Sequence, residues 1–413
     1  MYLHRHMEER IAHLGSRFKS VLVLGARQVG KTTLLRHLLQ KAQYFVFDPV
    51  QDLYDARQDP DMFLKSYNPP LILDEVQYVP EVLSAIKRFV DESNQVGQYY
   101  LTGSQNFAAL RQISESLAGR VAIVELDPLT IYEEQQLSSH QSWLKCYLQN
   151  PELLLSSDLK LLDKDLLTSI WQGGFPGTLG FSEPDFYDFF RSYLQTYVER
   201  DVRTLTNVRD LNQFSRFISL QSALTAQEMN SAYLGREVGI APQTAQEWIH
   251  ILENSYQWIT IPPFSGNLIK RSANKPKGYF SDTGFACHLV RINSREGLLG
   301  HPFFGHIFET FCVNQILRTL KTYGKAFNAY HWRSSGGAEV DLILELDGVL
   351  YPIEFKAKTN PNRRDARGLA QFMKDYAHLK IAHGIVVHGG DKAYKLHENI
   401  IAVPWRGYFL KAR

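Results

Sequence analysis

The chain has 413 residues, of which 44% are hydrophobic and 21% charged, and its formal net charge at pH 7 is +2. This length suggests two or three domains with ample core, while the lack of an apolar run near about 18 residues and of an apolar N-terminal leader predicts no membrane span and no export. The three cysteines lie far apart without CxxC spacing, which argues against a disulfide framework or a zinc site and favours the reducing cytoplasm.

Short apolar runs alternate with helical stretches between residues 21 and 130. Five runs are predicted as strands: Val21–Leu24, Tyr44–Phe47, Leu71–Leu73, Tyr99–Leu101 and Val121–Leu126. Segments between them, such as residues 82–91, have the spacing of helices. Alternation of strands and helices predicts an α/β fold with a parallel sheet covered on both faces.

The first of these strands leads into a segment that fits the P-loop pattern G-x-x-x-x-G-K-[ST], and a predicted helix follows it. Its glycines allow a tight turn that aims backbone N–H groups at phosphate oxygens, and the helix N-terminus adds partial positive charge. Lys31 is expected to reach the β- and γ-phosphates, and the Thr32 hydroxyl to ligate Mg²⁺. The predicted nucleotide site comprises Gly25, Ala26, Arg27, Gln28, Val29, Gly30, Lys31, Thr32 and Thr33.

Two carboxylates emerge from the third predicted strand, directly after Leu71–Leu73. Asp74 is expected to orient the coordination shell of Mg²⁺. Glu75 is expected to polarise the attacking water as a general base. The alternative is a buried strand that simply ends in exposed acids, but its position some forty residues after a P-loop favours the catalytic interpretation.

Polar and cationic candidates follow the next strand. Ser104 is predicted to sense the γ-phosphate or to position water, with Thr102 as second choice, and ordinary turn chemistry is the alternative for both. Arg120 and Arg200 are candidates for stabilising charge on the leaving phosphate, within the chain or in a neighbouring subunit. Each arginine could instead serve as a structural ion-pair partner.

Residues 231–270 have the pattern of a helix-turn-helix followed by a β-segment. Residues 233–240 fit a first helix and tight turn, and residues 241–252 fit a second helix with Pro242 in its first turn. The second helix has one apolar face, formed by Ala245, Trp248, Ile249 and Leu252. Such a helix is able to enter a DNA major groove, although its outer face carries Glu247, and a packing module between domains is the alternative. A basic cluster of Lys270, Arg271, Lys275 and Lys277 is predicted beyond it.

Acidic residues recur at suggestive places in the last third of the chain. Glu309 lies on a predicted helix, Asp341 on an apolar strand (337–344), and Glu354 with Lys356 on one side of a second strand (349–357). Asp341 and Glu354, completed by Glu309, could hold Mg²⁺, and Lys356 could orient the attacking water. Residues 301–413 contain 16 Lys and Arg against 10 Asp and Glu, a balance of +6 that hints at an acidic partner.

Together these segments resemble the prokaryotic AAA+ ATPases that carry a C-terminal domain of unknown function related to PD-(D/E)xK nucleases. The resemblance runs through most of the chain. It rests on residues 25–33, 73–77, 101–104, 116–120, 173–176, 279–284 and 339–341, and on the PD-(D/E)xK-like set of Asp341, Glu354 and Lys356.

The resemblance implies four parts, with ATP and Mg²⁺ as cofactors. These are an AAA+ P-loop core (1–130), a helical lid (131–202), a winged-helix module (203–278) and a nuclease-like mixed α/β domain (279–413). We expect Mg²⁺-dependent ATP binding and hydrolysis that moves the lid and the winged helix. The alternatives are a nucleotide-gated, Mg²⁺-dependent nuclease and an ATP-dependent switch that binds a protein partner. DNA or RNA is a further candidate partner, no membrane partner is expected, and the sequence leaves the oligomeric state open.

Overall fold

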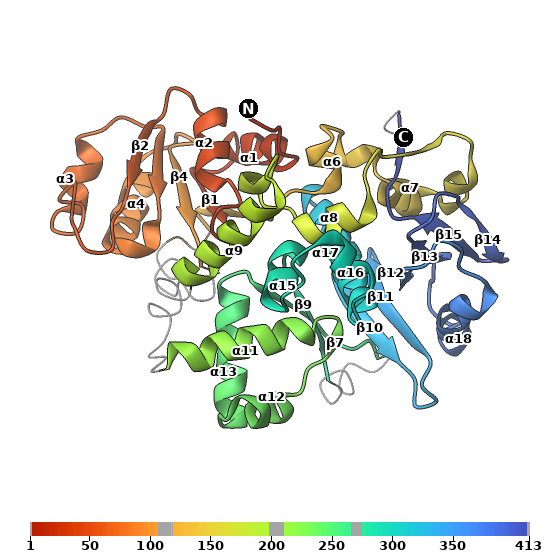
Figure 1. Cartoon of the computed structure of the whole chain (residues 1–413). Helices are drawn as coiled ribbons and strands as arrows, with labels where there is room; N and C mark the ends of the chain where they lie inside the picture. The colour runs from red at the N-terminus through yellow and green to blue at the C-terminus, as the bar shows by residue number, and fades with distance from the viewer. Residues whose placement is uncertain (1, 106–116, 118, 198–209, 266–274, 411–413) are drawn as a thin grey trace. The chain divides into compact units, whose positions relative to one another are not determined.

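The computed structural model describes residues 2–105, 117, 119–197, 210–265 and 275–410, which fold into two compact units (Figure 1). The smaller unit comprises Met1–Leu129, Phe175–Gly177 and Leu252–Gln257. The larger unit comprises Thr130–Gly174, Thr178–Ile251 and Trp258–Arg413. Within the described ranges, no helix combines the length and the apolar character needed to cross a lipid bilayer.

A five-stranded parallel sheet forms the centre of the smaller unit, with the strand order β2-β3-β4-β1-β5. All five predicted strands are confirmed, and their bounds are Ser20–Leu24 (β1), Gln43–Val46 (β2), Leu71–Asp74 (β3), Tyr99–Gly103 (β4) and Val121–Glu125 (β5). Because β1 lies between β4 and β5, its apolar side chains are fully buried, as expected for a central parallel strand. The fold class is therefore an α/β fold with a parallel sheet core.

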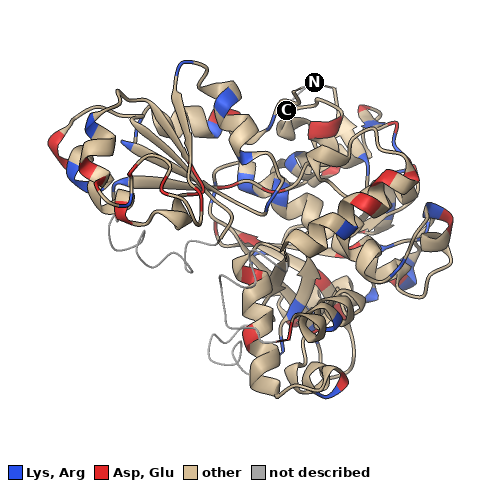
Figure 2. Cartoon of the chain, turned by 60° about the vertical axis from the view of Figure 1, so that its left-hand side comes forward, with Lys and Arg blue, Asp and Glu red and all other residues tan. Residues whose placement is uncertain are grey.

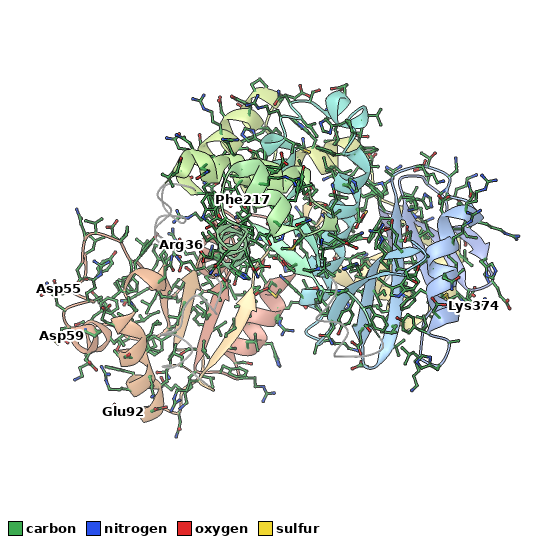
Figure 3. All side chains as sticks on the ribbon, turned by 90° about the horizontal axis from the view of Figure 1, so that it is seen from below. Arg36, Asp55, Asp59, Glu92, Phe217 and Lys374 are labelled. Atoms are coloured by element: carbon green, nitrogen blue, oxygen red, sulfur yellow. The ribbon has the colours of Figure 1, made fainter. Side chains whose placement is uncertain are left out.

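Helices precede and connect these strands, in keeping with the predicted alternation of strands and helices. They are α1 (Met7–Gly15), α2 (Lys31–Leu38), α3 (Pro60–Lys65) and α4 (Glu81–Glu92), and a short 3₁₀ turn at Val76–Tyr78 follows β3. Helix α4 buries Val82, Leu83, Ile86 and Val90 in the core of the sheet. In Figure 3, acidic side chains at the outside of this unit, Asp55, Asp59 and Glu92, point away from that core.

The larger unit contains a six-stranded mixed sheet at its C-terminal end, with the order β10-β11-β12-β13-β15-β14. The strands are Asn328–Arg333 (β10), Glu339–Leu346 (β11), Val349–Lys356 (β12), Gly384–His388 (β13), Tyr394–His397 (β14) and Ile400–Pro404 (β15). Strands β12, β13 and β15 run parallel, and the other neighbours run antiparallel. The long helix α17 (Phe304–Thr322) and helix α18 (Arg367–Asp375) contact this sheet.

A second part of the larger unit combines helices with a three-stranded antiparallel sheet of order β7-β9-β8. Its elements are α11 (Leu211–Ala223), β7 (Gln227–Glu228), α12 (Ser231–Val238), α13 (Pro242–Asn254), β8 (Trp258–Ile261) and β9 (Lys277–Phe280). Phe214 and Phe217 of α11 pack edge-on against Trp248 of α13, with ring centroids 5.1 and 5.3 Å apart. Figure 3 shows Phe217 among these helices. The predicted apolar face of α13 is confirmed, since its four residues are buried.

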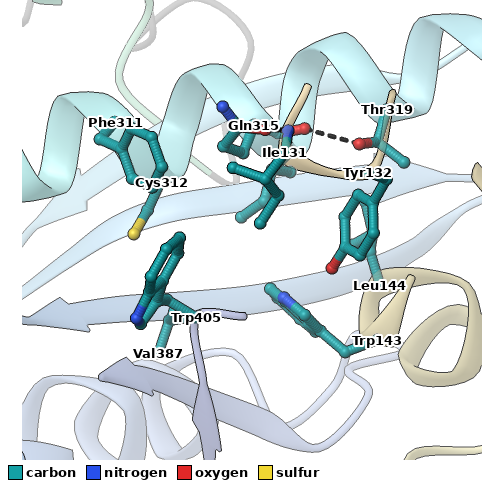
Figure 4. A pocket seen from close by; sticks show the side chains of 11 residues that line it. Ile131, Tyr132, Trp143, Leu144, Phe311, Cys312, Gln315, Thr319, Val387 and Trp405 are labelled. Carbon is teal, nitrogen blue, oxygen red and sulfur yellow. Dashed lines mark hydrogen bonds between the residues drawn. The ribbon is translucent and has the colours of Figure 1, made fainter. Parts of the chain in front are cut away.

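The segment that follows Leu129 pairs with the C-terminal strand of the chain. Strand β6 (Leu159–Leu161) pairs antiparallel with β16 (Gly407–Phe409), and the Tyr132 hydroxyl donates a hydrogen bond of 2.9 Å to the Gly407 carbonyl. Helices α6 (Ile131–Glu134) and α7 (Trp143–Gln149) line a small cavity together with α17 and Trp405 (Figure 4). The cavity measures about 20 Å³, room for about one water molecule.

Four further helices complete the larger unit: α8 (Leu166–Gln172), α9 (Glu183–Tyr197), α15 (Thr283–Leu289) and α16 (Arg295–Leu299). The buried carboxylate of Asp282, which caps α15, accepts a hydrogen bond of 2.8 Å from the Gly174 backbone N–H. This contact joins the Gly-Gly-Phe-Pro segment to α15. In the view of Figure 2, basic and acidic residues are interspersed along the elements.

Candidate functional site: the P-loop and the acid cluster

The P-loop is a tight bend between β1 and α2 whose backbone only glycine accommodates at two positions. Gly30, the N-cap of α2, has φ +94°. Gly25 has φ +148°, and a Cβ atom there would stand 2.1 Å from the Leu126 carbonyl oxygen. The motif spacing thus follows from local geometry, because Gly25 brings the loop close to Leu126 and Gly30 turns it into the helix.

Lys31 is buried and its side chain folds into the curve of the loop. The Nζ atom donates hydrogen bonds to the carbonyl oxygens of Gly25 (2.9 Å) and Ala26 (2.8 Å). Its charge therefore lies beside the backbone that would cradle phosphates, where a P-loop lysine acts. Arg27 extends from the same loop and donates a hydrogen bond of 3.2 Å to the Tyr78 hydroxyl.

The Asp74 carboxylate is the meeting point of three elements at the carboxyl edge of the sheet. Its Oδ2 atom accepts hydrogen bonds from Thr32 Oγ1 (2.7 Å) and from the Tyr44 hydroxyl (2.8 Å), and its Oδ1 atom accepts one from Thr102 Oγ1. Burial, then the hydrogen bond to Asp74, raises the pKa of Tyr44. A threonine hydroxyl beside a carboxylate at a P-loop is the hard-oxygen donor set that suits Mg²⁺, so the residues fit this ion.

Glu75 adopts a left-handed backbone conformation, with φ +60°, directly after β3. Its N–H donates a hydrogen bond of 3.1 Å to Thr102 Oγ1. The Gln77 amide Nε2 donates to Glu75 Oε2 (2.5 Å) and to the buried Ser104 hydroxyl (3.2 Å). The structure therefore brings together Glu75, Ser104 and Thr102, and it adds Gln77, which the sequence reasoning missed.

The N-terminal segment supports the P-loop from outside the motif. The buried Arg5 guanidinium donates hydrogen bonds to the carbonyl oxygens of Val29 (2.8 Å) and Asp127 (2.7 Å). The Arg5 N–H and the Tyr2 hydroxyl both donate to Glu8 Oε1, and the Tyr2 ring stacks on His37 of α2. Sequence reasoning missed Arg5, since an arginine 24 residues before its partner carries no local pattern.

The two candidate arginines differ in what the structure describes. Arg120 forms a bidentate pair with Asp91 of α4, through Nε (2.6 Å) and Nη2 (3.0 Å). This pairing lowers the pKa of Asp91 and corresponds to the structural alternative for Arg120. Arg200 lies outside the described residues.

The predicted C-terminal acids also converge, in a buried group that we call the acid cluster: Glu309, Asp341 and Glu354. They come from α17, β11 and β12, and each of the three residues is at most 8% exposed to solvent. Lys356 Nζ donates a hydrogen bond of 2.6 Å to Glu354 Oε1. Among the described residues, no three His, Cys, Asp or Glu side chains are arranged to hold a metal ion.

A lysine of the predicted basic cluster lies among these acids. Lys277 of β9 donates hydrogen bonds to Glu309 Oε1 (2.9 Å) and Asp341 Oδ1 (3.0 Å), and it is 9% exposed. Lys277 therefore faces two acids of the chain and does not form a basic cluster with its sequence neighbours, so this part of the prediction is wrong. Lys275 is exposed, while Lys270 and Arg271 lie outside the described residues.

The charges of the cluster act strongly on one another. Burial, together with the Asp341 charge, raises the pKa of Glu309 to about 7. Burial would also raise the pKa of Asp341, but the charges of Lys277 and Lys356 outweigh it and lower that pKa. Asp341 is therefore the firmly ionised member of the cluster, facing the Lys277 ammonium.

The helix-turn-helix elements leave one helix face open. Gly239, with φ +82°, ends α12, and Pro242 begins α13. The outer face of α13 carries four exposed side chains: Gln243, Gln246, Glu247 and His250. The local turn and the polar face agree with the expected pattern.

Three family models match parts of the chain. Residues 17–134 match the AAA domain, residues 163–296 match a domain of unknown function (DUF8612), and residues 304–408 match a domain of unknown function (DUF4143). The last match leaves the relationship to PD-(D/E)xK nucleases a prediction.

Two curated mycobacterial proteins are similar along most of the chain. They are the uncharacterized protein Rv2008c of Mycobacterium tuberculosis and the uncharacterized protein Mb2031c of Mycobacterium bovis. Each is 27% identical over 387 residues, which is 93% of this chain and 79% of the relative.

Among solved structures, the Walker-type ATPase PABY2304 of Pyrococcus abyssi aligns with a TM-score of 0.41 and 15% identity, covering 70% of this chain and 96% of the other. The RuvB Holliday junction branch migration motor of Thermotoga maritima aligns with a TM-score of 0.30 and 17% identity, covering 63% and 90%. The AAA match and the geometry of the P-loop together support an AAA-type ATPase domain over residues 17–134, a kind of domain that binds nucleotide.

Proposed function

We propose that this chain binds ATP with Mg²⁺ at the P-loop and hydrolyses it. The observation that carries the proposal is the hydrogen-bonded group around Asp74, which joins the P-loop threonine Thr32 to the end of β3 and to Thr102. Glu75 follows directly in the chain. A hydroxyl, a carboxylate and a second carboxylate at one edge of a parallel sheet are the parts that phosphoryl transfer requires.

The residues divide the work as follows. The loop from Gly25 to Thr33 presents backbone N–H groups to the phosphates, and Lys31 adds positive charge that grows in importance as charge moves onto the leaving oxygen. Mg²⁺, held by Thr32 and Asp74, would supply further neutralisation of the phosphates. Glu75 accepts a proton from the attacking water, which Ser104 and Gln77 help to place.

Lys31→Ala and Glu75→Gln together test this assignment. We expect Lys31→Ala to lose ATP binding and turnover, because the phosphates lose their charged partner. We expect Glu75→Gln to bind ATP but to hydrolyse it slowly, since the amide cannot accept the proton. Equilibrium binding of a fluorescent ATP analogue and steady-state phosphate release measure the two effects.

Exposed residues of the same charge provide matched controls. Lys41→Ala and Glu81→Gln should bind and hydrolyse ATP as the unaltered protein does, since both side chains are exposed and outside the site. Normal hydrolysis by Lys31→Ala would refute the nucleotide site. Normal hydrolysis by Glu75→Gln would remove Glu75 as the base.

We also infer that the part from α11 to β9 is a winged-helix module that acts on nucleic acid. Its support is the order of elements, in which a helix-turn-helix is followed by two paired strands, and the open polar face of α13. In this arrangement α13 is the helix suited to a major groove. The lid (131–202), the module (203–278) and the C-terminal domain (279–413) keep their predicted bounds in this proposal, and hydrolysis would move them.

A further inference from the structure

The acid cluster holds its own cation. The Lys277 ammonium lies between two carboxylates, 2.9 Å from Glu309 Oε1 and 3.0 Å from Asp341 Oδ1. The Tyr279 hydroxyl, from the same strand, donates a further hydrogen bond of 2.8 Å to Glu309 Oε1. Asp341 Oδ2 accepts a hydrogen bond of 3.1 Å from the Phe355 N–H. Glu309 Oε1 and both carboxylate oxygens of Asp341 are thus already engaged by donors of the chain.

An ammonium and a divalent cation cannot share this position. Mg²⁺ requires carboxylate oxygens at about 2.0–2.1 Å and usually keeps several waters. Lys277 uses the same oxygens of Glu309 and Asp341, and its positive charge would repel an incoming cation. The residues therefore do not fit a bound metal while Lys277 is in place.

The formal charges of the cluster lead to the same conclusion. With all three carboxylates ionised, as metal ligands must be, they and the ammonium groups of Lys277 and Lys356 sum to −3 + 2 = −1. A divalent cation would change this to +1 in a buried place, where unpaired charge is costly. Without Lys277 the sum is −2, which a divalent cation neutralises.

The backbone keeps Lys277 where it is. Strand β9 is the central strand of its sheet, and Lys277 is in register with Glu228 of β7 on one side and Ile261 of β8 on the other.

One carboxylate oxygen of the acid cluster remains available. Glu354 Oε2 is buried, in a residue only 4% exposed, and has no hydrogen-bond partner among the described residues. Once Lys277 is exchanged, this oxygen is a further possible ligand for a divalent cation.

We propose that Lys277 takes the place of a divalent cation in the acid cluster. In this chain the C-terminal domain then neither binds Mg²⁺ there nor cuts nucleic acid, and the lysine joins β9 to α17 and β11. Exchange of Lys277 for an uncharged residue leaves Glu309 and Asp341 without their cation, so that these side chains and Glu354 can turn toward a divalent ion in its place. This inference is independent of the proposed ATPase, because it concerns other residues.

The test measures Mn²⁺ binding to the full chain, with electron paramagnetic resonance as the method of detection. All proteins carry Asp74→Asn, which removes the metal-binding carboxylate at the P-loop. We expect no bound Mn²⁺ that depends on Asp341 when Lys277 is present. In Lys277→Met we expect one Mn²⁺ per chain, because the cluster then lacks its cation. Its affinity should be at least about ten-fold higher than that of any Mn²⁺ bound by the protein that keeps Lys277. Adding Asp341→Asn to Lys277→Met should abolish this binding.

Thermal unfolding and cleavage assays complete the test. Mn²⁺ should raise the melting temperature of Lys277→Met and leave that of the Lys277 protein unchanged. If Lys277→Met does not fold, the protein that keeps Lys277 is compared with its Glu354→Gln variant. The proposal is supported if neither of these two proteins binds Mn²⁺ in the acid cluster. Mn²⁺ binding or Mg²⁺-dependent cleavage of plasmid, single-stranded DNA or RNA by the Lys277 protein, lost in Asp341→Asn, would overturn it.

Discussion

Gln77 belongs to the candidate site because its amide nitrogen and its amide oxygen each have a distinct role there. The Nε2 atom donates to both Glu75 and Ser104, so one side chain fixes the two groups that handle water. Its Oε1 atom is buried and has no hydrogen-bond partner within the described chain. An unsatisfied buried oxygen is costly, and a water positioned for attack would satisfy it.

We therefore predict that Gln77→Ala lowers kcat for ATP hydrolysis by about ten-fold or more, because Glu75 loses its orientation. The KM for ATP should hardly change, since the Gln77 amide donates to Glu75 and Ser104, which lie outside the P-loop. Steady-state phosphate release across ATP concentrations separates the two constants. Gln51→Ala, at an exposed position, is the control. A rise in KM with unchanged kcat would contradict a positioning role.

At the same scale, sequence predicts residues that act through near neighbours. Lys31, Thr32, Asp74 and Glu75 lie in short motifs whose chemistry is readable from the spacing. Gln77 and Lys277 depend on partners 27 and 64 positions away, Ser104 and Asp341, which only the fold brings close. Lys277 was consequently counted with its charged sequence neighbours, although burial between two acids defines it.

Helix α13 shows what periodicity predicts for a whole element. Its four apolar positions are buried and its four polar positions are exposed, as the 3.6-residue repeat requires. The central strands were equally predictable, because continuous apolar runs mark buried parallel strands. The pairing of β6 with β16 was not, since strands of three residues carry little pattern and these two are separated by more than half of the chain.

For this element we predict that Glu247→Lys tightens binding to double-stranded DNA. The exposed carboxylate on α13 repels phosphates, so reversing its charge should gain several-fold in affinity and steepen the salt dependence. Fluorescence anisotropy at two salt concentrations provides the measurement. Glu92→Lys on α4 makes the same change of net charge in the smaller unit and should have a lesser effect. Equal gains in both variants would speak against α13 as the contact helix.

The stability of the larger unit can be followed separately from that of the smaller one. All six tryptophans of the chain lie between residues 143 and 405, in the larger unit. In the same unit His331 is buried, and its Nε2 atom hydrogen-bonds with the Lys275 carbonyl at 3.0 Å. Burial, then the charge of Lys277, lowers the pKa of His331 from 6.5 to about 4.

We predict that His331 makes the larger unit less stable at acidic pH. As the pH falls below 6.5, this histidine is protonated in the unfolded chain, whereas in the folded chain it stays neutral until about pH 4. The folded state therefore loses stability as the pH falls through this window. The contribution is about 3 kcal/mol. Urea unfolding followed by tryptophan fluorescence should show a weaker pH dependence in His331→Gln than in the exposed-site variant His397→Gln. The same slope in both variants would exclude His331 as its source.

The hydrogen bond between Ile131 and α17 has a mechanical consequence. The Ile131 N–H donates to Gln315 Oε1 at 3.0 Å, and both residues belong to the larger unit. A capping box at Thr130 and Glu133 pairs further donors at the same helix start. The first turn of α6 is consequently held both by its own cap and by α17, so this end of the helix resists fraying.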